Sequence, residues 1–123
     1  SAVLPAVAVG NAVVAVPSPR WPLLATDCYQ LFDTSDVPGG VINLVTGSRE
    51  ELTKVLAAHD DVDGMWYWGT ADGSGEVEKL SAGNMKRTWV DRGRGRDWAT
   101  DGEGEEFLRE ATQVKNIWVP YGA

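Results

Sequence analysis

The sequence predicts an α/β domain, a small parallel sheet with helices on both faces, followed by a detached C-terminal strand. Apolar, β-branched runs alternate with helical stripes over residues 1–90, which is typical of parallel strands joined by right-handed crossovers. A glycine-rich charged stretch then separates this part from a last apolar run. The chain has 123 residues, enough for one modest core.

The first two predicted elements are a buried strand and a helix. Residues 11–16 form a continuous apolar run, closed by a Pro-Ser-Pro turn, as expected of a strand that is buried on both faces. Residues 23–33 carry one helical stripe, made of Leu24, Cys28, Leu31 and Phe32. We expect this stripe to pack on the sheet, with Cys28 as a core residue.

A second strand and helix follow, and then a third strand. The apolar run over 41–46 predicts a strand that Gly47 ends. Ser48 lies three residues before a glutamate, which is the spacing of a capping box. The helix that begins there is expected to run to about His59, where a cation complements the helix dipole. The third predicted strand covers residues 65–68.

The remaining predicted elements are shorter. A short helix is predicted over 75–82, a fourth strand over 86–90, a helical turn over 107–111 and a last strand over 114–119. The glycines and charges of residues 91–106 indicate a flexible linker. The predicted organisation is therefore a core over 1–90, a linker over 91–106 and a C-terminal strand segment over 107–123.

Charge and composition exclude several classes of function. Asp and Glu number 18 against 11 Lys and Arg, which gives a net charge of −7, so no nucleic-acid partner is expected. No apolar run approaches the ~20 residues that cross a bilayer, so no membrane partner is expected. A single cysteine excludes an internal disulfide and favours a reducing, cytoplasmic location. With one histidine in addition, no metal site is predicted.

Four segments, in order, resemble the aldehyde dehydrogenase superfamily. Residues 10–18 match the family's first strand with its Pro-Ser end, and residues 37–47 match its second strand with the glycine that follows. Residues 59–70 match the segment that ends in the family's Phe-Thr-Gly-Ser turn, and residues 111–118 match its C-terminal oligomerisation strand. The resemblance covers about residues 5–90 and 107–122 and implies a Rossmann-like fold. It looks closest to the degenerate second unit of the double-length branch, in which a full dehydrogenase precedes an incomplete copy that lacks the catalytic domain.

The resemblance also implies which residues would contact a cofactor. Vestigial contacts fall on Ser18, Gly47, Gly69 and Thr70. The family's ribose-binding lysine is Val16 here, and the nearby acidic position is Pro19. We therefore expect no tightly bound cofactor, and NAD if any.

No catalytic residue is predicted for this chain. The family's oxyanion asparagine and nucleophilic cysteine have no counterpart in this sequence, and its general-base glutamate falls on Val90 or Asp91. The lone thiol, on Cys28, lies in none of the family's catalytic positions.

The favoured hypothesis is a non-catalytic pseudo-dehydrogenase module that supports assembly of an aldehyde dehydrogenase. The parent reaction would be NAD-dependent oxidation of an aldehyde to a carboxylic acid. Two alternatives remain open, a free-standing weak nucleotide-binding domain and a dehydrogenase subunit completed by a partner chain. The expected partner is a second copy or the parent dehydrogenase domain, reached through Val114, Ile117, Trp118 and Val119. We expect this strand to pair across a subunit or domain boundary, not with the strand of residues 86–90.

Arginines and tryptophans form two further groups of interest. Arg92, Arg94 and Arg96 could bind an anion, but their acidic neighbours favour internal pairing or plain solvation. We expect the first tryptophan group to pack together, and exposure of the second would suggest an interface. The first group is Trp66, Trp68 and Trp89, and the second is Trp21, Trp98 and Trp118.

Overall fold

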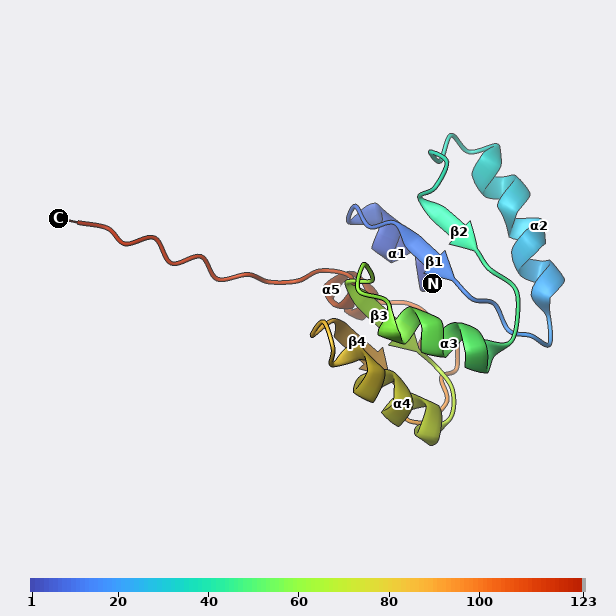
Figure 1. Ribbon diagram of the computed structural model, residues 1–123. Helices are drawn as coiled ribbons and strands as arrows, with labels where there is room; N and C mark the ends of the chain where they lie inside the picture. Colours follow the sequence, from blue (N-terminus) through green and yellow to red (C-terminus); the bar gives the residue numbers. More distant parts are fainter. Residues whose placement is uncertain (123) are drawn as a thin grey trace.

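The computed structural model describes residues 1–122 and confirms the predicted α/β class (Figure 1). Its elements are α1 (Val3–Ala8), β1 (Val13–Ala15), α2 (Pro22–Asp33), β2 (Ile42–Leu44), α3 (Arg49–Ala58), β3 (Gly64–Tyr67), α4 (Ala71–Ser81), β4 (Arg87–Val90) and α5 (Glu106–Glu110). The sequence pattern thus located every strand and helix of residues 11–110, with differences at the ends.

The strands form two parallel pairs rather than the single sheet that we expected. β1 pairs with β2, with Val13 opposite Ile42, and β3 pairs with β4, with Gly64 opposite Arg87. In a doubly wound sheet, the strand that precedes the first crossover helix lies at the centre. Among residues 1–122, no such strand joins the two pairs.

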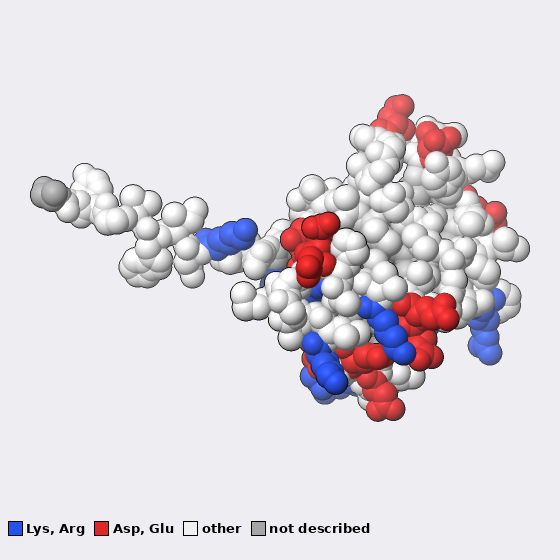
Figure 2. Space-filling view, in the orientation of Figure 1, with Lys and Arg blue, Asp and Glu red and all other residues white. Residues whose placement is uncertain are grey.

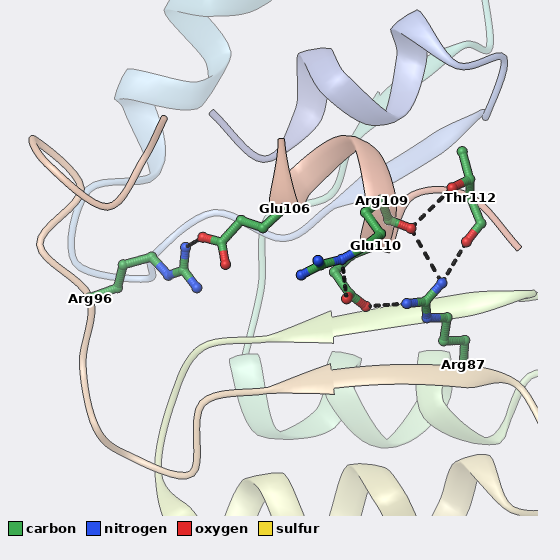
Figure 3. A network of polar contacts seen from close by, with 6 residues as sticks. All are labelled: Arg87, Arg96, Glu106, Arg109, Glu110 and Thr112. Carbon is green, nitrogen blue, oxygen red and sulfur yellow. Dashed lines mark hydrogen bonds and ion pairs between the residues drawn. The ribbon is translucent and has the colours of Figure 1, made fainter. Parts of the chain in front are cut away.

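The main core lies between the β3–β4 pair and the helices α3 and α4. Met65 of β3 packs there with Ala57 of α3 and Val77 of α4, and all three are buried. Figure 3 shows α5 on the opposite face of the pair, so helices cover both faces. Since successive strand residues face opposite sides, Tyr67 joins the core, whereas Trp66 packs against α5.

The prediction that the stripe of α2 packs in the core is wrong. No residue of α2 is buried, the Cys28 side chain is exposed, and Leu24 and Leu31 are 65% and 63% exposed. The β1–β2 pair is one strand spacing wide, about 4.8 Å, and covers only part of a helix about 10 Å across. For the same reason, Val14 of β1 is exposed rather than buried.

Helix α3 ends at its cap residue His59, as predicted, and a cation that the sequence analysis did not single out, Lys86, binds the carbonyls at this end. The ammonium group of Lys86 donates to the carbonyls of Leu56, Ala57 and His59 at 3.3, 2.8 and 2.5 Å. The Nδ1 atom of His59 instead accepts a hydrogen bond from the backbone N–H of Asp61.

The segment after β4 contains buried groups that the sequence pattern did not indicate. Arg96 is half-buried and its guanidinium lies 4.9 Å from the centre of the Trp89 ring. Trp98 stacks edge-on against Trp68 at 5.0 Å, and Gly102 is buried. The sequence analysis counted only the charges and glycines here, whereas an arginine can bury its stem and stack on aromatic rings.

Residues 112–122 leave the body of the protein as an extended segment with no helix or strand (Figure 1). Its large apolar side chains are strongly exposed, and the least exposed of them is Val119 at 74%. Over the described residues, none of the helices combines the length and the apolar character that crossing a membrane requires.

Candidate functional site

The carboxyl ends of β3 and β4 form one polar edge, the place where open α/β sheets bind ligands. Thr70 caps α4, because its hydroxyl oxygen accepts from the backbone N–H of Gly73 at 3.1 Å. The carboxylate of Asp91 accepts from the backbone N–H groups of Gly69 at 3.3 Å and Gly93 at 3.1 Å. Side chains of the chain itself thus engage three amides at this edge.

The phenol ring of Tyr67 lies so close to two of these glycines that a larger residue there would overlap it. A Cβ atom added to Gly69 or to Gly73 would overlap the Tyr67 side chain. The ring therefore lies directly on the turn between β3 and α4. In a phosphate site, glycines of such a turn allow a ligand to approach the backbone. Here the Tyr67 side chain occupies the space next to these glycines.

The four predicted cofactor contacts follow strands of two different pairs. Gly69 and Thr70 adjoin at the start of α4, whereas Ser18 and Gly47 follow the strands of the other pair. The Ser18 hydroxyl oxygen accepts from the backbone N–H of Arg20 at 3.3 Å, and a Cβ at Gly47 would touch Leu52. Within residues 1–122, no hydrogen bond links the two strand pairs at these positions.

A groove of about 690 Å³ lies between α3 and α4 beside this edge. It is lined by Arg49, Glu50, Thr53, Tyr67, Thr70, Asp72, Gly73, Gly75, Glu76, Lys79 and Leu80. Sequence reasoning missed its charged members. The available signal was the charge pattern of α3 and α4, which places acidic and basic side chains on neighbouring helical turns.

Lys54 connects the two helices at the rim of the groove. Its ammonium group lies 2.8 Å from the carboxylate of Glu50 and 3.8 Å from that of Glu76. The hydrogen bond from Lys54, with its positive charge, lowers the pKa of Glu50. The same bond, with the negative charges of Glu50 and Glu76, raises the pKa of Lys54. The groove is thus lined by both acidic and basic side chains, and two of its carboxylates are paired with Lys54.

The predicted internal pairing of the arginines is confirmed for two of the three. One guanidinium nitrogen of Arg92 donates to both carboxylate oxygens of Glu78 of α4, at 2.7 and 2.9 Å. Arg96 pairs with Glu106 of α5. The partners are thus helix residues rather than the adjacent loop acids. Arg94 lines a hollow of about 300 Å³ with Trp89 and its two neighbouring arginines.

The predicted packing of the first tryptophan group is also confirmed. Trp66 lies edge-on to Trp68 at 5.8 Å and to Trp89 at 5.1 Å. Phe107 of α5, only 1% exposed, completes this cluster. All three tryptophans of the second group are exposed, and Trp98 also contacts the cluster through Trp68.

Over the part of the chain that the structure describes, no three His, Cys, Asp or Glu side chains gather in a way that could hold a metal ion. The polar edge, the groove and the exposed C-terminal segment are therefore the features that bear on function.

Comparison with known proteins identifies relatives for most of this fold. The family model described as the aldehyde dehydrogenase family matches residues 1–96. The NADP/NAD-dependent aldehyde dehydrogenase PuuC of Escherichia coli is 37% identical over 90 residues, which are 72% of this chain and 18% of PuuC. An N-succinylglutamate 5-semialdehyde dehydrogenase of Yersinia pestis is 35% identical over 85 residues, 69% of this chain and 17% of that protein.

Solved structures give the same result. A mutant of aldehyde dehydrogenase C from Pseudomonas syringae, complexed with NAD+ and octanal, matches with a TM-score of 0.70 and 37% identity. The match covers 72% of this chain and 18% of that one. The aldehyde dehydrogenase KauB of Pseudomonas aeruginosa has a TM-score of 0.70 and 34% identity, over 73% of this chain and 18% of KauB. The chain thus spans about 18% of the length of these relatives.

Proposed function

The chain belongs to the aldehyde dehydrogenase family, and we propose that it is a non-catalytic module that assembles and stabilises an enzyme of this family. The parent reaction is then NAD-dependent oxidation of an aldehyde to a carboxylic acid, catalysed outside this chain. We further propose that the module corresponds to the degenerate C-terminal unit of the double-length branch. The intact mass of the native protein tests this point, since a double-length protein far exceeds 13.3 kDa.

The observation that carries the assembly role is the exposure of the C-terminal segment. Val114, Ile117, Trp118 and Val119 are 74–92% exposed, although such side chains gain about 25 cal/mol per Å² when they leave water. An extended apolar segment with free backbone groups has the chemistry of a strand that adds to a sheet edge elsewhere. A second copy or the parent dehydrogenase domain can supply that edge.

The arrangement of candidate catalytic groups supports the non-catalytic part of the proposal. Cys28 lies on the exposed helix α2 and makes no hydrogen bond to a base among the described residues. The imidazole of His59 accepts from Asp61, and the carboxylate of Asp91 accepts from two backbone N–H groups. A nucleophile needs an adjacent base to be activated, and none of these groups adjoins the thiol.

Removing the C-terminal segment tests the assembly role. We expect a chain that ends at Gln113 to keep its circular dichroism spectrum and become monomeric, because residues 114–122 are exposed and belong to no helix or strand. Ile117→Pro should act in the same way, because proline removes a ladder donor and fixes φ. Ile117→Val, which keeps strand propensity, is the matched control. Light scattering that shows the same oligomer mass for the truncated and full chains contradicts the assembly role, as does loss of the fold on truncation.

The groove beside α4 favours weak nucleotide binding as a second candidate function, since it adjoins the carboxyl ends of β3 and β4, where open α/β sheets bind ligands. We expect NAD to bind weakly or not at all. Val16 and Pro19 have no side-chain donor or acceptor for ribose, the amides of the edge are engaged, and acidic side chains line the groove. Calorimetry on the full chain measures this, and a dissociation constant in the low micromolar range would contradict it. The variant Val16→Lys with Pro19→Glu should bind more tightly only if the groove accepts the cofactor.

A further inference from the structure

The short helix α5 ends in a junction whose carbonyl groups are held by side chains from distant parts of the chain. One guanidinium nitrogen of Arg87, at the start of β4, donates to the carbonyls of Arg109 at 3.3 Å and Thr112 at 2.5 Å. The other bonds the carboxylate of Glu110 at 2.7 Å. Figure 3 shows the Arg87 side chain pointing into this junction from the β3–β4 pair. The last carbonyls of a helix have no partner within the helix. Arg87 supplies donors to two carbonyls here, and the Arg109 carbonyl also accepts from the backbone N–H and the hydroxyl of Thr112 at 3.2 and 3.0 Å.

A second donor comes from the other half of the fold. The side-chain amide of Asn11, just before β1, donates to the carbonyl of Ala111 at 2.9 Å and to that of Ala6 at 3.0 Å. Asn11 and Ala111 are 100 positions apart in sequence. Three carbonyls of the junction, those of residues 109, 111 and 112, are thus bonded by two side chains from separate strand pairs.

The beginning of α5 is also fixed. Phe107 is buried against the tryptophan cluster, and Glu106 pairs with Arg96 (Figure 3). A five-residue helix has little stability of its own. These contacts at both ends therefore hold α5 in place, and they determine where and in which direction residues 113–122 leave the surface.

We propose that Asn11 and Arg87 form an anchor that positions residues 113–122 for strand pairing with a second copy of this chain; this inference rests on the assembly role proposed above. Fixing one backbone residue costs about 1–2 kcal/mol of conformational entropy. A pre-ordered junction removes that cost from the association step. The anchor makes the first residues of the segment a defined starting point for a ladder.

Charge and free strand edges favour a second copy as the partner. The only charged residue in 113–122 is Lys115, whereas the rest of this chain carries the acidic excess. Figure 2 shows one basic group on the extended segment and many acidic groups over the body. Among the described residues, β2 pairs only with β1 and β4 only with β3. Each copy therefore offers both a free strand and sheet edges that can receive one.

The test measures self-association of full-length variants by sedimentation velocity over a range of concentrations. Freeing about one residue of the junction corresponds to an association constant about tenfold lower, so we expect that loss for Arg87→Gln and for Asn11→Ala. Arg94→Gln removes the same charge from a residue outside the junction and should associate like the wild type. Hydrogen exchange gives a second readout, in which the junction amides of residues 109–112 should exchange faster in both anchor variants.

The outcomes separate the anchor from the assembly role. If truncation after Gln113 gives monomers but both anchor variants associate like the wild type, the anchor proposal is wrong and the assembly role stands. If the full chain is itself monomeric, or truncation changes nothing, the proposed self-assembly and the anchor both fail. Association that appears only with an added complete dehydrogenase overturns the choice of a second copy. If Arg87→Gln unfolds, Asn11→Ala, which leaves the net charge unchanged, tests the anchor by itself. A wild-type association constant for Asn11→Ala then contradicts the anchor.

Discussion

Lys86 shows how a single buried cation supports this fold at the scale of one residue. The ammonium group has three carbonyl partners at the end of α3, and the residue itself is buried. The sequence could not reveal this role, because Lys86 lies 27 positions beyond His59 and meets α3 only after β3 and β4 pair. A histidine that ends a helix is a visible local signal, whereas a distant lysine is not.

The substitution Lys86→Met is expected to lower the free energy of unfolding by about 2–3 kcal/mol. Methionine has a similar size but no donor, so it leaves buried carbonyls of α3 unsatisfied. Lys79→Met, on the exposed side of α4, is the matched control and should change stability by less than about 0.5 kcal/mol. Urea denaturation of the three proteins gives the comparison. Equal midpoints for Lys86→Met and Lys79→Met would show that the ammonium group does not stabilise α3.

At the scale of the element, local patterns located the strands and helices but not their surroundings. The capping position Ser48 was predicted and accepts from the backbone N–H of Glu51. Helix α4 begins before its predicted start, because the glycines at 73 and 75 obscured the cap at Thr70. The apolar stripe of α2 was visible in the sequence, but its exposure depends on how many strands lie beneath it. Sheet width is a non-local property that no helical period encodes.

The two glycines inside α4 should respond to alanine with opposite signs. In Gly73→Ala, the new Cβ meets the Tyr67 ring, and we expect a loss of about 1–3 kcal/mol from overpacking. In Gly75→Ala, the new Cβ meets nothing within 4 Å, so the helix gains about 0.5–1 kcal/mol from the higher propensity of alanine. Thermal unfolding of both variants measures the difference. A gain in stability for Gly73→Ala would contradict the position of the Tyr67 ring on the turn.

At the scale of the whole molecule, the two strand pairs have unequal cores. Buried hydrophobic residues gather around β3, α3 and α4, with Ala57 and Val77 fully inaccessible. In the half built from β1, α2 and β2, Ile42 is the buried hydrophobic residue. The candidate site follows the same division, since the turn at Gly69 and Thr70 lies in the well-packed half and Ser18 in the other. The order of segments alone suggested one site across one sheet, because it carries no information about how strongly the two halves pack.

Hydrogen exchange of the full chain should therefore show two levels of protection. Local opening is easiest where few apolar contacts must break. We expect the amides of α2, β1 and β2 to exchange at least tenfold faster than those of β3, β4 and α4, which corresponds to about 1.4 kcal/mol or more between the two opening reactions. Mass spectrometry of peptides from each half, after timed exchange at one pH, provides the measurement. Exposed amides of residues 113–122 serve as the fully exchanging reference. Equal protection in both halves would mean that α2 is held by contacts beyond those of this fold, and that the domain opens as one cooperative unit.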